Sequence, residues 1–356
     1  MLNIFITAKI LAEFICAEVQ KLDHERSQMY RIFKNKKYVH LYVGTIDKSS
    51  QEKLANFNQM NDFKIDKSKA DFIDSIPSQP SRVLEEPNGL FILNISKIDA
   101  ENISSKYGVL CFSSDSINEN KLIDQNIEYT YNTKELIGDW GNILYCIKGL
   151  PSNALVFVDR FLFMNDRPTF ANGIQNVFEI LKFLLPQQFD RNQIYHVCIV
   201  FSTNSKVQKM KLSFQDLAKE LNNKMKELAK GYSIEMELIG IPSDSRFYDD
   251  THNRRIISNY FIVRAEHKIN AIFNQNSSCA QTLTPQRLFT YNCLRSYSAP
   301  PLKSIEQTIG MLRQLSRILK QEICNGLCCY ALNGRQIEKK DLSKNSVLCL
   351  RNRIIT

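Results

Sequence analysis

The feature that most restricts the fold is a regular alternation of apolar runs and amphipathic stretches between residues 154 and 241. Continuous apolar runs are typical of buried strands, and apolar residues at three- and four-residue spacing are typical of helices. The expected strands are 154–163, 194–202 and 232–241, and the expected helices are 174–184 and 213–230. Because strand and helix alternate, the sequence predicts a layered α/β domain for the central part of the chain.

Local signals place the ends of these elements. Pro186 stops the first helix, because proline cannot donate a helical backbone hydrogen bond. Ser213 is a favourable N-cap for the second helix, and Gly231 suits the turn that closes it. The apolar segment 254–263 predicts two further strands around a turn at residues 258–259.

Both flanks differ from this pattern, and a chain of 356 residues is too long for one core. Residues 1–150 alternate short apolar runs with polar stretches, which predicts a small α/β or α+β domain of unknown role. Residues 281–356 contain an amphipathic helix at 302–323 and a hairpin signal at 333–334. The predicted architecture is therefore an N-terminal domain, a central α/β domain at 151–280, and a basic, mainly helical C-terminal subdomain.

Positive charge is concentrated in the last part of the chain. The net charge is +9, and residues 281–356 hold twelve Lys and Arg against four acidic residues, which leaves +8 there. Such a segment attracts polyanions, so nucleic acid is the first expected partner and an anionic lipid surface the second. A solvated basic face without a partner is the alternative. The expected contact residues on the polar face of the helix are Arg313, Arg317 and Lys320.

The cysteines do not form a metal-binding pattern. Only Cys324, Cys328 and Cys329 of the ten cluster, and no histidine or second CxxC lies near them to complete a zinc site. We therefore expect reduced thiols, no metal and no cofactor. A cytoplasmic location is also expected, because no apolar run nears the ~20 residues that span a bilayer and the start lacks a signal-peptide pattern.

The densest group of ionisable residues is DDTHNRRIISN, residues 249–259. His252, Arg254 and Asn259 have the spacing of the phospholipase D signature, which is histidine, any residue, lysine, four residues and aspartate. The group also follows the third expected strand and precedes another. Residues 154–270 therefore resemble a phospholipase-D-like domain. The resemblance is to a divergent branch, found at the C-terminus of some eukaryotic membrane-trafficking proteins, in which arginine replaces the lysine.

This resemblance implies a role for each residue. His252 would be a nucleophile that forms a phosphohistidine. Arg254, with Arg255 beside it, would hold phosphate oxygens through the planar guanidinium. Asn259 stands where the family has an aspartate that stabilises the charged histidine, so turnover should suffer more than binding. We expect these side chains to converge in one pocket. The expected supporting residues are Asp159, Arg160, Asp249 and Asp250.

Two functions of different classes follow from the resemblance. The domain is either a phosphate-binding module that contacts nucleic acid within a larger assembly, such as one of bacterial defence, or a metal-independent phosphodiesterase. The second function, a nuclease, would need a homodimer, because the reaction requires a second histidine as general acid. Asn259 and the single signature favour the binding module. An ordinary polar loop before a strand is the third reading of the same residues.

Overall fold

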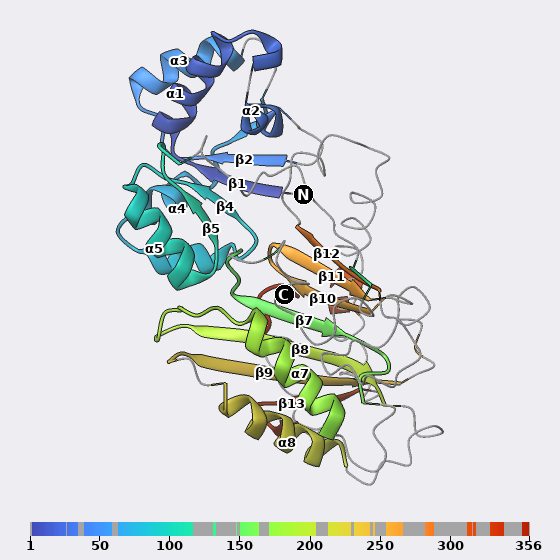
Figure 1. Ribbon diagram of the computed structural model, residues 1–356. Helices are drawn as coiled ribbons and strands as arrows, with labels where there is room; N and C mark the ends of the chain where they lie inside the picture. The colour runs from blue at the N-terminus through green and yellow to red at the C-terminus, as the bar shows by residue number, and fades with distance from the viewer. Residues whose placement is uncertain are drawn as a thin grey trace. The chain divides into compact units, whose positions relative to one another are not determined.

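The chain folds into two compact α/β units in a computed structural model (Figure 1). One unit comprises residues 1–127 and 288–302, and the other comprises 128–287 and 303–356. The predicted α/β class is confirmed. The residues that the structure describes are 2–25, 27–34, 39–58, 63–116, 131–132, 147, 150–163, 171–203, 213–228, 231–242, 245, 254–265, 282–287, 312–314, 316–317, 328–337 and 351–355.

The first unit is built on a five-stranded sheet in which every neighbouring pair is parallel. Its strands, in spatial order, are β3 (Ile65–Asp66), β2 (Val39–Val43), β1 (Leu2–Ile6), β4 (Leu90–Ile92) and β5 (Leu110–Phe112). Short, almost wholly apolar strands are typical of parallel sheets that are covered on both faces. The sequence predicted either an α/β or an α+β domain for this region. An all-parallel sheet is typical of the α/β class.

Helices fill the connections between these parallel strands, as parallel pairing requires. They are α1 (Ala8–Val19), α2 (Gln28–Phe33), α3 (Lys48–Asn58), α4 (Ala70–Ser75) and α5 (Lys97–Tyr107), with 3-10 turns η1 (Asp23–Glu25) and η2 (Pro80–Glu85). On one face, Phe5 and Phe91 stack at 5.0 Å and pack against apolar residues of α4, η2 and α5.

The second unit is built on a nine-stranded mixed sheet. Its strands, in spatial order, are β14 (Arg335–Gln336), β13 (Cys329–Leu332), β9 (Ser233–Ile241), β8 (Ile194–Ser202), β7 (Ala154–Val158), β10 (Arg254–Ser258), β11 (Phe261–Ala265), β12 (Thr282–Arg287) and β6 (Tyr131–Asn132). The central strands β7, β8 and β9 are parallel, and all other neighbouring pairs are antiparallel. The sheet therefore changes from parallel to antiparallel between β7 and β10.

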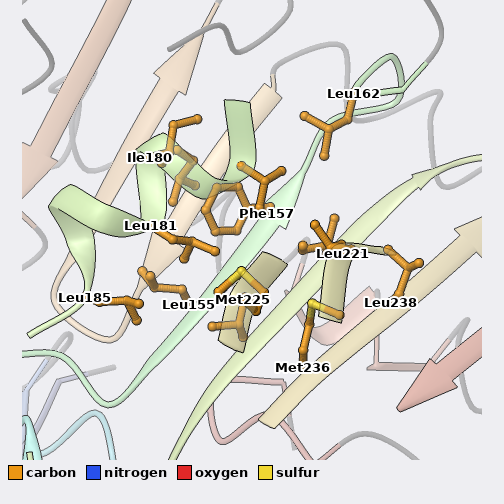
Figure 2. Close-up of a cluster of buried hydrophobic side chains, with 14 of the residues drawn as sticks. Leu155, Phe157, Leu162, Ile180, Leu181, Leu185, Leu221, Met225, Met236 and Leu238 are labelled. Carbon is orange, nitrogen blue, oxygen red and sulfur yellow. The ribbon is translucent and has the colours of Figure 1, made fainter. Parts of the chain in front are cut away.

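Helices α7 (Ala171–Leu184) and α8 (Phe214–Lys226) cover one face of this sheet (Figure 1). Leu155 and Phe157 of β7 point into the core that these helices close, together with Leu181 and Leu221 (Figure 2). Ser213 forms a capping box with the first turn of α8, which confirms the predicted N-cap. The helix ends at Lys226, before the predicted stop at glycine.

The end of the chain joins the second unit. The predicted hairpin turn is confirmed, since Asn333 and Gly334 have φ values of 48° and 80° between β13 and β14. Strand β13 extends the sheet because it pairs with the edge of β9. The described part of residues 303–356 therefore belongs to the second unit, and the mainly helical character expected for this region stays a prediction.

Two further findings concern helices. Residues 312–314 and 316–317 are helical, and the rest of the predicted helix at 302–323 lies outside the described residues. Within the described stretches, no helix combines the length and the apolar character needed to cross a bilayer.

Candidate phosphate-binding site

A buried ion pair lies where β7 ends and β10 begins. The two strands are antiparallel, with Val158 opposite Arg255, so the same register places Asp159 opposite Arg254. Arg254 Nε lies 3.2 Å from Asp159 Oδ1, and the side chains are 15% and 1% exposed. The polar interruption of an otherwise apolar strand is therefore explained by a charged partner on the neighbouring strand, as buried charges require.

The backbone holds the Asp159 carboxylate in a fixed position. The N–H of Asp159 donates to Val200 O at 3.1 Å, which continues the ladder with β8 by one residue. The chain then turns, and the N–H of Phe161 donates to Asp159 Oδ1 at 2.8 Å. A carboxylate with such partners is oriented before any ligand arrives, and so is the guanidinium of Arg254 that it contacts.

The ring of Phe161 contacts two arginines. The guanidinium carbon of Arg254 lies 5.0 Å from the ring centroid, and that of Arg160 lies 5.5 Å from it. Arginine stacks on aromatic rings through cation–π attraction, which leaves the N–H groups at its edge able to donate. Phe161 therefore gathers two guanidinium groups beside the end of β7.

A second pair of arginines lies on the opposite face of the same strands. Arg255 is 4% exposed and is directly opposite Arg264 of β11 in the sheet register. Burial lowers the pKa of Arg255, and the positive charge of Arg264 adds to this effect. Like charges in directly opposed positions of a sheet repel each other, which destabilises the charged form of Arg255.

These side chains lie on the two faces of the sheet, and we call them together the arginine cluster: Arg160 and Arg254, with Asp159 and Phe161, on one face, and Arg255 and Arg264 on the other. The group contains four guanidinium groups and one carboxylate. Planar guanidinium groups bind phosphate oxygens in pairs, so the chemistry of the cluster suits a phosphate.

The structure brings together only some of the residues that the sequence singled out. Arg254 and Asp159 meet, Arg160 shares the ring of Phe161 with Arg254, and Arg255 lies on the opposite face of β10. Asn259 directly follows the other end of β10, about 16 Å along the strand from Arg254 at the usual rise per residue. The signature spacing therefore does not place these two residues in one pocket, because β10 between them is extended. His252, Asp249 and Asp250 lie outside the described residues.

Asn259 has its own buried contacts. Its Oδ1 accepts hydrogen bonds from Asn153 N at 3.3 Å and from Ser258 Oγ at 3.0 Å, and the residue is 2% exposed. These bonds tie the β10–β11 turn to the residue that precedes β7. Asn259 thus has a role in holding the sheet.

We expect Asn259→Ala to lower the free energy of unfolding by about 1 to 3 kcal/mol, because the buried Asn153 N–H loses its acceptor. Urea titration measures this loss. Affinity for phosphate ligands should stay within twofold of wild type, since Asn259 is distant from the arginine cluster. A large loss of affinity in a folded Asn259→Ala protein would instead assign the residue to the site.

Two members of the arginine cluster, Phe161 and Arg264, were not recognised in the sequence. Both lie within apolar stretches, VDRFLF and YFIVRA. Only the register of β7, β10 and β11 places them beside Arg254 and Arg255. If the register of the β10–β11 hairpin had been known, it would have placed Arg264 directly opposite Arg255.

The basic residues of the C-terminal region are in part described. Arg313 and Arg317 are exposed and lie four residues apart in helical segments, so they share one helix face. Lys320 lies outside the described residues.

Comparison with known proteins gives no family. A scan against protein-family models finds no match, and a search of curated proteins also finds none. In the described portion of the chain, no three His, Cys, Asp or Glu side chains group closely enough to hold a metal ion.

Proposed function

We propose that the second unit is a phosphate-binding module of the phospholipase-D-like type and that it contacts nucleic acid. The observation that carries the proposal is the arginine cluster at the end of β7 and the start of β10, with Arg254 oriented by Asp159 and Phe161. Ligands of α/β sheets commonly bind beyond the carboxyl ends of the parallel strands. The cluster lies at that end of β7.

The fixed orientation of the Arg254 side chain supports a role in phosphate binding over a purely structural role for this residue. An arginine fixed by a carboxylate and an aromatic ring loses little side-chain entropy when it binds an anion. Arg255 and Arg264 add two guanidinium groups on the other face of the same strands.

Nucleic acid is the proposed source of the phosphate. Arg313 and Arg317 are exposed on one helix face, and the last 76 residues carry +8, so further phosphates along a strand would find positive charge. A binding role is preferred to catalysis, because Asn259, which stands in the place of the catalytic aspartate, is bonded to Asn153 and Ser258 at the far end of β10.

The test is binding of a labelled single-stranded oligonucleotide to the full chain in the presence of a chelator. Arg254→Ala and Arg255→Ala should each weaken binding by about 10- to 150-fold, which corresponds to one lost charge-assisted contact of about 1.5 to 3 kcal/mol. Each should also reduce the salt slope of log K by about 0.7 per lost phosphate. Arg254→Lys keeps a charge beside Asp159 but loses the planar fork, so its affinity should be intermediate.

The matched control is Arg335→Ala, which removes one positive charge from an exposed position of β14. Its affinity should stay within about twofold of wild type. Equal losses in all variants would mean that net charge alone attracts the oligonucleotide, and the arginine cluster would not be the site. Arg313→Ala/Arg317→Ala should weaken binding of the oligonucleotide but not of a mononucleotide.

The same assay reports on catalysis and assembly. Chelator-resistant cleavage that disappears in His252→Ala would establish the phosphodiesterase function in place of the binding module. We also propose a homodimer, as in family members with a single signature, and light scattering of the full chain measures it.

A further inference from the structure

The second face of the nine-stranded sheet carries a polar group that is unusual for a sheet interior. Glu237 lies in the middle of β9, and its side chain points away from the helix-covered core. It is 1% exposed, with Glu235 and His196 beside it on the same face. A buried carboxylate is expensive unless hydrogen bonds replace its water.

The segment 351–355 supplies most of those hydrogen bonds. The N–H of Arg351 donates to Glu237 Oε1 at 2.9 Å, and the N–H of Asn352 donates to Glu237 Oε2 at 2.8 Å. Tyr330 of β13 donates its hydroxyl to Oε1 at 2.8 Å. The Glu237 carboxylate thus accepts hydrogen bonds from two successive backbone N–H groups. Such an arrangement can bind the main chain of a peptide.

Side chains of the segment also form hydrogen bonds with this face of the sheet, and these bonds depend on the identity of the residues. Asn352 is 0% exposed, and its Nδ2 donates to Leu155 O of β7 at 2.9 Å. Arg351 reaches Glu235 at 3.0 Å, and Arg353 donates to Ile194 O at 2.7 Å. The segment therefore bridges β7, β8 and β9 through an amide and two guanidinium groups.

The rest of the segment is fixed by its own turn and by apolar contact. Asn352 Oδ1 accepts from Ile354 N at 3.1 Å, which closes a tight turn. Ile354 and Ile355 are 8% and 3% exposed. The main-chain, side-chain and apolar contacts are all made by five consecutive residues, as in a bound peptide ligand.

From this geometry we infer that the Glu237 face is a peptide-binding site, filled in cis by residues 351–355, that also accepts the same sequence supplied by another molecule. The floor of the site combines the polar side chains of Glu235, Glu237 and His196 with Val156 and Cys198, which lie in register with Glu237. Water can solvate the three polar groups when the segment leaves. An apolar floor would have made the segment an inseparable part of the core. The ligand class is a short peptide with asparagine between two arginines, followed by two isoleucines.

The test uses the full chain with its own segment weakened. Asn352→Ala removes the bond to Leu155 O and the turn bond to Ile354 N. Hydrogen exchange at amides 351–355, followed by mass spectrometry, should accelerate at least tenfold relative to wild type. The exposed β14 variant Arg335→Ala should exchange like wild type.

A labelled synthetic peptide, LRNRIIT, should then bind the Asn352→Ala chain and bind wild type at least tenfold more weakly, since the wild-type segment competes from within the molecule. The matched peptide LRARIIT should bind at least tenfold more weakly than LRNRIIT. Adding Glu237→Gln to the Asn352→Ala chain should abolish binding, because an amide oxygen cannot replace both carboxylate acceptors.

Failure of LRNRIIT to bind a folded Asn352→Ala chain would overturn the inference, and so would equal binding of the two peptides. If Asn352→Ala does not fold, Arg353→Ala replaces it with the same readouts, since it removes only side-chain bonds at the rim of the site. Unchanged exchange in both variants would likewise show that the segment is not held by these contacts.

Discussion

Asp159→Ala should lower the free energy of unfolding by about 3 to 5 kcal/mol, the largest loss we expect from a single substitution in this chain. Asp159 is 1% exposed and Arg254 is 15% exposed, so removal of the carboxylate leaves a guanidinium mostly shielded from water beside β7. The variant also removes the acceptor of the Phe161 N–H. Urea unfolding at pH 7, followed by circular dichroism, measures the loss.

A double variant separates the contribution of the Arg254 charge from the other causes of the stability loss in Asp159→Ala. Asp159→Ala/Arg254→Met should be more stable than Asp159→Ala alone, because it no longer buries a guanidinium that has lost the Asp159 carboxylate, and it keeps the apolar contact with Phe161. The control is Asp190→Ala, whose carboxylate accepts one hydrogen bond from Asn192 N in an exposed turn. That variant should lose no more than about 1 kcal/mol. If Asp159→Ala loses as little as the control, the ion pair does not organise the site.

The second large effect is a loss of stability in acid that depends on His196. Burial lowers the pKa of His196 to about 4, and the positive charges of Arg353 and Arg351 add to the shift. In the unfolded chain the pKa is about 6.5. Between these values the unfolded chain takes up a proton that the folded protein does not. The free energy of unfolding therefore falls as the pH falls from about 6.5 towards 4, and above that window this group adds no pH dependence.

The expected size is about 2 to 3 kcal/mol between pH 7 and pH 4.5, from ~1.4 kcal/mol per unit of pKa difference. Carboxylates titrate in the same range, so the informative quantity is the difference between wild type and His196→Gln at the two pH values. His24→Gln, at an exposed position, controls for the loss of a histidine. Identical pH dependence in wild type and His196→Gln would contradict the prediction.

The sequence was sufficient where a local pattern decides the structure. Apolar runs at 194–202 and 232–241 became β8 and β9, because only a buried strand accommodates such runs between helices. The Ser213 cap and the Asn333–Gly334 turn were predicted because each depends on the chemistry of a few neighbouring residues. The α/β class followed from the order of these elements.

The tertiary structure alone decided how distant residues combine. The signature spacing grouped Arg254 with Asn259, whereas strand pairing grouped Arg254 with Asp159 and left Asn259 with Asn153, about a hundred residues away. A spacing along the chain becomes a distance only once the strand direction and register are fixed.

The covering of Glu237 likewise depends on contacts between residues that are distant in the sequence. Two glutamates interrupt the apolar residues of SIEMELIGI, and the segment 351–355 covers Glu237, the second of them. The hydrogen bonds that make this burial stable come from residues about ninety or more positions away. The sequence by itself determined which segments are strands and helices, because those depend on near neighbours. Which charges meet, and which polar face is covered, was decided by the pairing of remote strands.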